Sequence, residues 1–317
     1  MDRERARKRL EGCYVTVPTM FRDEDLELDL AAQRQAVRFL IDSGIREGTG
    51  VLLAGGAAGD FTTMTLPERA RVAETVVDEA NGAIGVVMGA QTTSTRELVE
   101  LAQTAHKVGA EFIQVSAPFY FAHTEEDFYE YVMAAAEAAD VGIILYNTYW
   151  TSVAASTGLV DRLLDVPNFI ALKWSVPASS HMGFERLVDQ YCGRLHIIDN
   201  DSRFVSTHIM GARGIEVHTA NYWPEFGVRL WHLLESEEYV EAQREMIRVV
   251  APFYELWFEM MEYTGGDGYL DKLCMELVGV GSSRWRPPTR DVRDQFRDKA
   301  RQMLERCGVP RLEAVAP

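Results

Sequence analysis

Lys173 stands in an apolar stretch, an unusual place for a charged side chain. The run over residues 170–175 is followed by turn-forming residues at 176–180, a pattern typical of a buried strand. Burial disfavours an ammonium ion and lowers the pKa of a lysine, and the neutral amine is the form that attacks a carbonyl carbon to give an imine. Lys173 is therefore a candidate imine-forming nucleophile; the alternative is a lysine whose head group reaches water from a strand end.

Tyr146 ends a second apolar stretch, residues 141–147, about one βα unit before Lys173. The strands of a parallel barrel end at the same mouth, so Tyr146 and Lys173 are expected on neighbouring strands there. A phenol in this place would move protons beside an iminium ion. The alternative is a core tyrosine whose hydroxyl has a structural partner.

The rest of the chain predicts the elements that would position these two residues. Short buried strands alternate with helix-period segments about eight times. The expected strands cover residues 13–17, 50–54, 84–89, 112–115, 143–146, 169–173, 195–198 and 214–217. This rhythm predicts a (β/α)8 TIM barrel with a C-terminal helical extension, and a doubly wound sheet is the alternative. We assign residues 1–236 to the barrel with a short N-terminal segment, and residues 237–317 to the extension.

Composition limits the possible partners. The chain has 317 residues, 47% hydrophobic and 25% charged, and is long enough for one large α/β domain. Its net charge of −16 argues against nucleic acid, which attracts clustered lysine and arginine. The four cysteines form no C-x-x-C pair and suggest neither zinc nor a disulfide scaffold. Without a signal peptide or a long uncharged apolar run, we expect a cytoplasmic protein with no membrane partner.

A glycine-rich loop follows the second expected strand. Residues 54–61 read AGGAAGDF, and glycines let backbone N–H groups turn toward a carboxylate or a phosphate. The loop lacks the lysine of a phosphate-binding loop and the G-x-G-x-x-G spacing, so nucleotide binding is not predicted. A purely structural turn is the alternative.

Four motifs in this order resemble the dihydrodipicolinate synthase / N-acetylneuraminate lyase family. They are residues 56–60, residues 118–120, Tyr146-Asn147 and Leu172-Lys173. The resemblance runs from about Cys13 to the C-terminal helices. It implies a (β/α)8 barrel with a helical extension, a homotetramer, and class I aldolase chemistry on 2-keto acids. It implies no metal and no cofactor other than the covalent imine on Lys173.

Carried over residue by residue, the resemblance makes Lys173 the Schiff-base lysine and Tyr146 the proton-transfer phenol. Tyr120 matches a tyrosine that, in the synthases, reaches a neighbouring protomer's site. The loop that holds the keto acid's carboxylate corresponds to Gly56, Ala57, Ala58, Gly59 and Asp60. Ala57 and Ala58 replace the family's hydroxylated pair, so a threonine-mediated proton relay is missing, and Asp60 replaces a glutamate.

Other departures from the family concern the substrate. Tyr149 stands where the family usually has a proline, and the arginine that marks true dihydrodipicolinate synthases aligns near Thr151. Trp174 follows the lysine, where the family often has an acidic residue. The chain is therefore not expected to be a typical dihydrodipicolinate synthase.

Aromatic residues dominate the strand ends and predict an aryl or apolar substrate tail, because sugar acids need many buried hydrogen-bond partners. These rings belong to Phe119, Tyr120, Phe121, Tyr149, Trp150, Trp174, Tyr222 and Trp223. The substrate-binding candidates outside the glycine-rich loop are Asn147, Trp150, Arg203, Glu216, His218 and Trp223.

The leading prediction is a Schiff-base lyase that acts on a 2-keto acid, either a pyruvate-dependent aldolase or a hydratase-aldolase. One alternative is a dehydratase of a 2-keto-3-deoxy sugar acid. The other is a relative that binds a keto acid without catalysis, suggested by the missing hydroxyls at Ala57 and Ala58.

Overall fold

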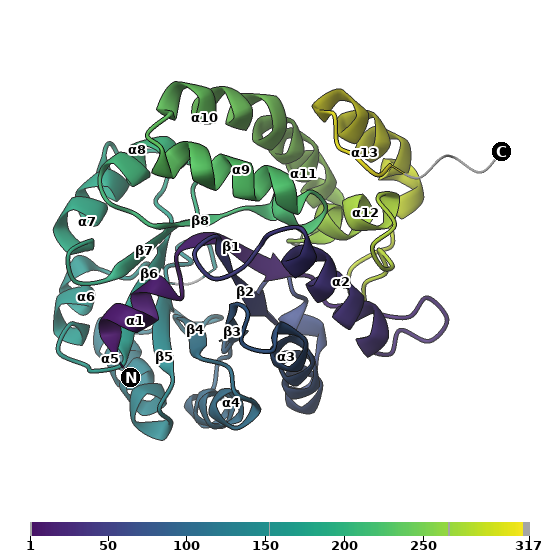
Figure 1. Cartoon of the computed structure of the whole chain (residues 1–317). Coiled ribbons are helices and arrows are strands. Elements are labelled where there is room, and N and C mark those ends of the chain that lie inside the picture. Colours follow the sequence, from purple (N-terminus) through teal and green to yellow (C-terminus); the bar gives the residue numbers. More distant parts are fainter. Residues whose placement is uncertain (1, 152, 266, 313–317) are drawn as a thin grey trace.

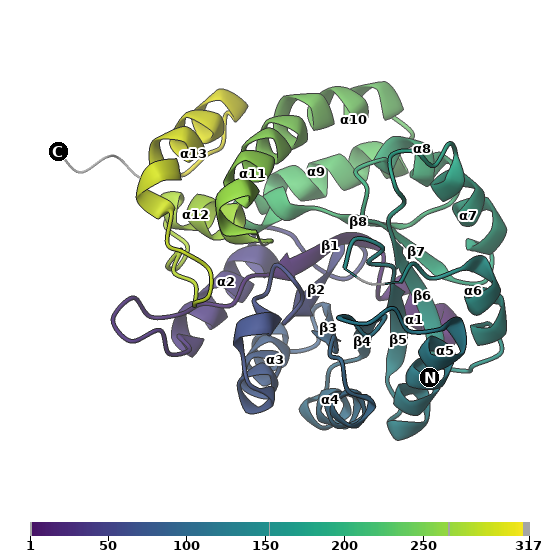
Figure 2. The same cartoon turned by 180° about the vertical axis from the view of Figure 1, so that it is seen from behind.

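Eight parallel strands close into a barrel in the computed structural model, which describes residues 2–151, 153–265 and 267–312. The strands follow one another in chain order, and β1 pairs with β8 (Figures 1 and 2). They are β1 (Gly12–Val17), β2 (Gly50–Ala54), β3 (Gly85–Gly89), β4 (Phe112–Ser116), β5 (Gly142–Tyr146), β6 (Phe169–Trp174), β7 (His196–Asp199) and β8 (Gly214–Glu216). The predicted barrel is confirmed, and the doubly wound sheet is wrong because its edge strands would not pair.

One helix follows each strand and packs on the outside of the barrel (Figure 1). These helices are α2 (Leu30–Asp42), α3 (Leu66–Ala80), α4 (Thr95–Val108), α5 (Glu125–Ala138), α6 (Thr157–Leu163), α7 (Gly183–Tyr191), α8 (Phe204–Ile209) and α9 (Pro224–Glu235). Local signals fix where some of them begin. Thr65 and Glu68 form a capping box before α3, and Thr124 and Asp127 form one before α5.

A short helix, α1 (Arg3–Lys8), covers the amino end of the barrel, where the sequence predicted only a charged segment. Ala6 and Leu10 pack against the inward-facing apolar residues of the strands. The guanidinium of Arg3 donates to the carbonyl of Pro167, just before β6, at 3.1 Å. With this end covered, the carboxyl mouth is the end that remains for a site.

Four further helices follow α9 and lie along one side of the barrel (Figures 1 and 2). They are α10 (Tyr239–Glu245), α11 (Ala251–Thr264), α12 (Tyr269–Leu277) and α13 (Arg293–Cys307), with a π-helical turn (Met246–Val250) between α10 and α11. Helix α12 reaches the carboxyl mouth. The Nζ of Lys272 lies 2.6 Å from the carboxylate of Asp60, which follows β2, and both side chains are buried.

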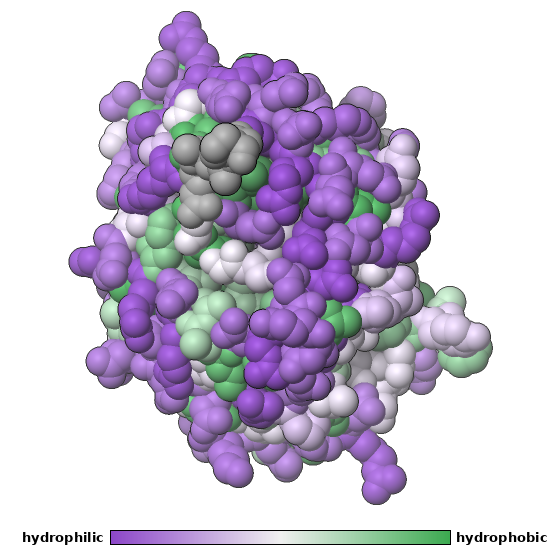
Figure 3. All heavy atoms as spheres, turned by 90° about the vertical axis from the view of Figure 1, so that its right-hand side faces the viewer, coloured by the Kyte–Doolittle hydropathy of each residue, from purple (hydrophilic) through white to green (hydrophobic). Residues whose placement is uncertain are grey.

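Hydrophilic residues predominate on the side that carries the C-terminal helices, with smaller hydrophobic patches between them (Figure 3). This surface agrees with the high net negative charge of the sequence. Within the described residues, every helix is too short or too polar to cross a membrane.

Removing one partner of the ion pair between Lys272 and Asp60 should strongly destabilise the protein. In the Lys272→Met variant the Asp60 carboxylate stays buried without its counter-charge, so we expect a loss of about 3–5 kcal/mol in the free energy of unfolding, measured by urea denaturation. Adding Asp60→Asn should recover much of this loss, because asparagine is neutral and tolerates the left-handed backbone (φ 60°) found there. A loss below about 1 kcal/mol, the range of an exposed pair, would contradict the expectation.

Candidate active site

The pairing of β5 with β6 sets Tyr146 beside Lys173 at the carboxyl ends of the two strands. Two residues earlier on each strand, Ile144 and Ala171 belong to the apolar cluster inside the barrel. Because residues two apart on a strand share a face, Tyr146 and Lys173 point into the barrel mouth. The two side chains that the sequence predicted to meet therefore lie together.

The Lys173 ammonium is enclosed by two aromatic rings and one carboxylate. Its Nζ lies 4.6 Å from the ring centre of Tyr146 and 4.9 Å from that of Tyr14. The Oε2 of Glu216 is 2.6 Å away, and only 5% of either charged side chain is exposed. The sequence predicted Glu216 as a substrate-binding residue, whereas the structure pairs it directly with the lysine.

Two polar residues of β1 complete the inner layer of the site. The hydroxyl of Thr16 donates to Oε1 of Glu216 at 2.8 Å, which leaves Oε2 facing Lys173. The hydroxyl of Tyr14 donates to Oε1 of Gln114 on β4 at 2.9 Å. The first bond joins the neighbouring strands β1 and β8 and fixes the direction of the Glu216 carboxylate, and the second spans the barrel interior from β1 to β4.

The hydroxyl of Tyr146 has one weak partner among the described residues. Nδ2 of Asn200 donates to it at 3.4 Å, and the same amide donates to Oγ of Ser175 at 2.8 Å. Burial raises the pKa of Tyr146 well above 10, and the nearby charges of Asp267 and Glu216 raise it further. Burial therefore favours the protonated form of this phenol, the form that can give a proton to a reacting atom.

The glycine-rich loop forms a tight turn at the mouth. The N–H groups of Gly59 and Asp60 donate back to the carbonyls of Gly56 and Ala57, at 3.0 and 3.1 Å. The N–H groups of Ala57 and Ala58 are not donors in these bonds. A Cβ on Gly59 would come within 2.8 Å of the Gly56 nitrogen, so only glycine fits there.

Asp60, predicted to bind substrate, is held by α12 instead. Its carboxylate pairs with Lys272, and burial raises the pKa of this carboxyl while Lys272 opposes the rise. Asp60 therefore anchors the helical extension to the loop that precedes α3.

His218 begins a 3-10 turn (His218–Asn221) directly after β8 and also contacts α12. Its Nδ1 lies 2.9 Å from Oδ2 of Asp271, which also accepts from Nδ2 of Asn221 at 3.1 Å. Its ring stacks on Phe253 of α11 with centres 5.7 Å apart. Burial opposes the charge of the imidazolium, but the carboxylate of Asp271, aided by Asp267 and Glu216, outweighs it and raises the pKa of His218 to about 10.

Asp267 reaches the mouth from the loop between α11 and α12. Its Oδ1 is buried without a hydrogen-bond partner in the described part of the chain, and burial raises its pKa. Its charge interacts with those of His218, Glu216 and Lys173. The neighbouring Gly268 packs directly against the glycine-rich loop, because a Cβ at position 268 would lie only 2.6 Å from the Cα of Ala58.

Two other predicted substrate-binding side chains have internal partners. The Asn147 amide donates to the carbonyl of Ser175 at 2.9 Å and accepts from the N–H of Ala155 at 3.0 Å. The Arg203 guanidinium lies 3.5 Å from the carboxylate of Glu185. These side chains fix the segments after β5 and β7, respectively, and are not free at the mouth.

Five of the eight predicted aromatic residues fall into three groups. Trp223 and Trp174, which are 8% and 4% exposed, are packed in the hydrophobic core outside the barrel. Trp150 is 52% exposed, and its ring meets the edge of Tyr146 with centres 6.0 Å apart. Tyr120 and Phe121 are 87% and 67% exposed beyond β4.

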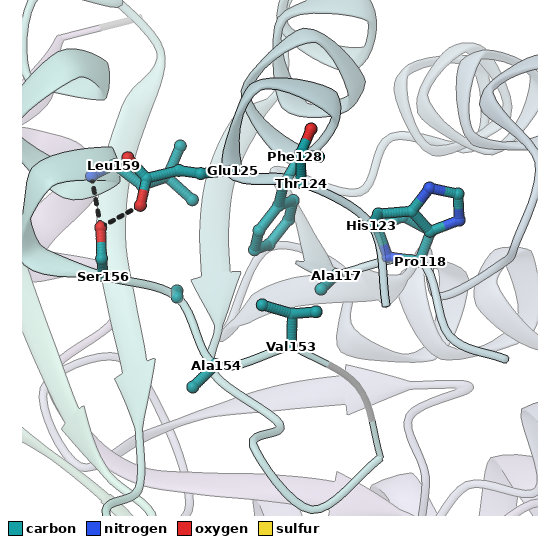
Figure 4. Close-up of a pocket in the computed structure, with 11 residues that line it drawn as sticks. Ala117, Pro118, His123, Thr124, Glu125, Phe128, Val153, Ala154, Ser156 and Leu159 are labelled. Atoms are coloured by element: carbon teal, nitrogen blue, oxygen red, sulfur yellow. Dashed lines mark hydrogen bonds between the residues drawn. The ribbon is translucent and has the colours of Figure 1, made fainter. Parts of the chain in front are cut away.

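A pocket lies next to Phe121, whose ring contacts that of the pocket residue His123 (Figure 4). Its lining comes from the segments before and within α5 and α6, and includes Phe128 and Val153. Ser156 bridges the two segments by bonding to Glu125 and to the N–H of Leu159. Neither Lys173 nor Tyr146 lines this pocket, so we do not assign it to the reaction.

Several site residues were not predicted from the sequence. They are Tyr14, Thr16, Gln114, Asp267 and Asp271. Polar residues at alternate positions of β1 and β4 were an available signal for the first three. Within the described residues, no three His, Cys, Asp or Glu side chains are arranged to hold a metal ion.

Catalytic residues of (β/α)8 barrels lie at the carboxyl mouth, and a buried lysine there is suited to imine formation. The chain belongs to the Dihydrodipicolinate synthetase family, whose sequence model matches residues 9–307. It is thus an enzyme of the class I aldolase type, a pyruvate-dependent lyase.

Relatives and solved structures agree with this assignment. The 4-hydroxy-tetrahydrodipicolinate synthase of Methanopyrus kandleri is 29% identical over 304 residues, 95% of this chain and 97% of that protein. Its counterpart in Prosthecochloris aestuarii is 29% identical over 305 residues, covering 95% and 98%. The crystal structure of dihydrodipicolinate synthase from Acinetobacter baumannii complexed with pyruvate has a TM-score of 0.84 at 23% identity, covering 95% of this chain and 99% of that chain. CdNal from Clostridium difficile in complex with mannosamine has a TM-score of 0.80 at 21% identity, covering 93% and 98%. The two structures establish the fold.

The raised pKa of His218 has a measurable effect on stability. The folded-state pKa of about 10 exceeds the ordinary value of 6.5, so the contribution of His218 to the free energy of unfolding is complete below pH 6.5 and is lost as the pH rises toward 10. NMR titration should find His218 protonated at neutral pH. Asp271→Asn should lower the pKa of His218 and reduce the loss of stability between these pH values; an unchanged titration would contradict the assignment.

Proposed function

We propose that the chain is a pyruvate-dependent aldolase or hydratase-aldolase in which Lys173 forms an imine with a 2-keto acid. One observation carries the proposal: a buried amine at the barrel mouth lies 4.6 Å from the ring centre of Tyr146 and 2.6 Å from a carboxylate. An amine so enclosed, with proton-transfer groups beside it, suits nucleophilic attack on a ketone.

The imine supplies the electron sink for the reaction. Once protonated, it accepts the electron pair released when the bond between C3 and C4 of a 4-hydroxy-2-keto acid breaks, which gives an enamine and an aldehyde; in a hydratase-aldolase the C4 hydroxyl comes from water added across C3=C4. Tyr146 gives its proton to C3 of the enamine and takes the proton that the C4 hydroxyl loses as it becomes the aldehyde, and water then releases pyruvate from Lys173. This chemistry needs no metal or bound cofactor, because the iminium ion stabilises the carbanion.

The glycine-rich loop would hold the carboxylate of the keto acid. The N–H groups of Ala57 and Ala58, which the turn itself does not use, are available for this role. Without side-chain hydroxyls, the loop would bind the substrate but take no part in proton transfer.

The mouth supports a substrate tail without a second carboxylate. Trp150 offers an exposed ring beside Tyr146, and the segment around Thr151 carries no cation in the place that the family resemblance gives to an arginine. Lys173 and His218 are already paired with Glu216 and Asp271, and Asp267 adds a further carboxyl, so neither of these two cations is free to bind a tail carboxylate. We therefore propose an aryl or apolar tail.

A second candidate is the activity named for the relatives, 4-hydroxy-tetrahydrodipicolinate synthase. The similarity over nearly the whole chain favours it, whereas the lack of an arginine near Thr151 disfavours it. The aldehyde that condenses with pyruvate distinguishes the two.

We also propose a homotetramer, as the family resemblance implies, and a cytoplasmic location, as the charged N-terminal segment suggests. The exposed rings of Tyr120 and Phe121 suit a contact with a neighbouring subunit, in which Tyr120 would approach that subunit's site. Sedimentation of the wild-type chain and of Tyr120→Ala would measure this assembly.

Trapping with borohydride tests the proposed nucleophile. Wild-type protein incubated with pyruvate and then reduced should gain a pyruvate-derived mass on the peptide that contains Lys173. Lys173→Arg keeps the positive charge beside Glu216 but cannot form the imine, and should gain none. Absence of the adduct in the wild type would refute the proposal.

Tyr146→Phe should still form the adduct but turn over more slowly, because general acid–base groups contribute about 10²–10⁴-fold in rate. Turnover within a factor of about three of the wild type would show that Tyr146 is not the proton-transfer group.

Measuring the release of pyruvate from a set of substrates tests the proposal that the substrate tail is aryl or apolar. We expect pyruvate and benzaldehyde from benzylidenepyruvate and little reaction with 2-keto-3-deoxygluconate. Efficient condensation of pyruvate with aspartate semialdehyde would instead support the activity named for the relatives.

A further inference from the structure

Glu216 has the closest contact to the proposed nucleophile and no role in the mechanism described so far. Its Oε2 lies 2.6 Å from Nζ of Lys173, and the two groups form a buried ion pair. Its other oxygen is held by the Thr16 hydroxyl at 2.8 Å. The carboxylate therefore has one anchored oxygen and one oxygen in contact with a reacting atom.

The position of Glu216 on β8 is fixed by the pairing of this strand with β1. β8 pairs with β1, in a register that sets Glu216 opposite Tyr14 and two residues from Thr16. Side chains of Glu216 and Lys173 are almost completely buried, so bulk water has little access to move protons between them.

The chemistry of imine formation requires a proton carrier at this place. A lysine paired with a carboxylate must lose a proton before its nitrogen attacks, and the hydroxyl of the carbinolamine must gain one before it leaves as water. In the family that this chain resembles, the glycine-rich loop carries side-chain hydroxyls. Ala57 and Ala58 replace them here, so the side chains of this loop cannot carry the proton.

We propose that Glu216 is a catalytic acid–base residue that takes a proton from Lys173 and returns it to the departing hydroxyl of the carbinolamine. This inference rests on the proposed imine mechanism and adds a residue to it.

The steps balance as follows. Nζ of Lys173 gives a proton to Oε2 of Glu216, and the freed lone pair attacks C2 of pyruvate while the carbonyl electron pair moves to oxygen. Tyr146 gives its proton to this oxygen and takes one from the nitrogen, which leaves a neutral carbinolamine. Glu216 then protonates the hydroxyl, water leaves, and the nitrogen lone pair forms the protonated imine. Glu216 ends as a carboxylate, and no oxidant or other reactant is used.

A purely structural role for Glu216 gives the opposite expectation. If the carboxylate only held the ammonium in place, its removal would free the amine and leave imine formation equally fast or faster. The rate of imine formation therefore separates the two roles, whereas loss of overall activity would not.

The test measures the rate at which borohydride traps pyruvate on Lys173, sampled over time and followed to completion. Glu216→Gln keeps the size of the side chain, and we expect trapping about 10²–10⁴-fold slower than in the wild type but reaching the same final mass. Glu235→Gln, a partly exposed substitution of the same chemistry on α9, is the matched control and should trap at the wild-type rate. Trapping by Glu216→Gln at or above the wild-type rate would overturn the proposal.

A second variant covers the case in which Glu216→Gln does not fold. In Glu216→Ala, added formate should increase the trapping rate by replacing the missing carboxylate, whereas the same concentration of chloride should not; the absence of rescue by formate would overturn the proposal. Failure of the wild type to trap pyruvate would refute the proposed function itself, so the two failures are distinguishable.

Discussion

A charged amine enclosed in a barrel must be matched by an opposite charge, and the pair of Lys173 with Glu216 meets this requirement. The pair depends on barrel closure, because Thr16 of β1 holds the carboxylate of β8 and these strands meet only where the sheet closes on itself. The same closure brings the ring of Tyr14 against the amine. The pairing of β1 with β8 therefore both closes the barrel and positions the groups that surround the Lys173 amine.

The helical extension supplies much of the charge balance at this mouth. Lys272 neutralises Asp60, and Asp271 neutralises His218, so α12 bonds to the segments that follow both β2 and β8. Asp267 adds a further carboxyl above the inner layer. Although the extension lies outside the barrel in the chain order, it forms part of the wall of the site.

The sequence predicted the fold well because each element carries its own local signal. Apolar runs mark the strands, and the expected strand ends near Tyr146 and Lys173 agree with the observed ones. It predicted less of the outer site, because the partners of Asp60 and His218 come from α12, more than fifty residues from His218 and over two hundred from Asp60. No local pattern reveals such pairs. Asp267, in a loop between two helices, has no periodic signal at all.

The close approach of Gly268 to Ala58 limits how this enzyme can be converted into its relatives. Ala58 is 3% exposed, and the backbone of the α11–α12 loop occupies the space beside its methyl group. A larger β-branched residue grafted at Ala58 would have to displace that loop and, with it, the carboxyl of Asp267. Chimeras that exchange the glycine-rich loop between homologues should therefore also exchange the α11–α12 loop. The two segments are in contact, so a larger residue in one requires a compensating change in the other.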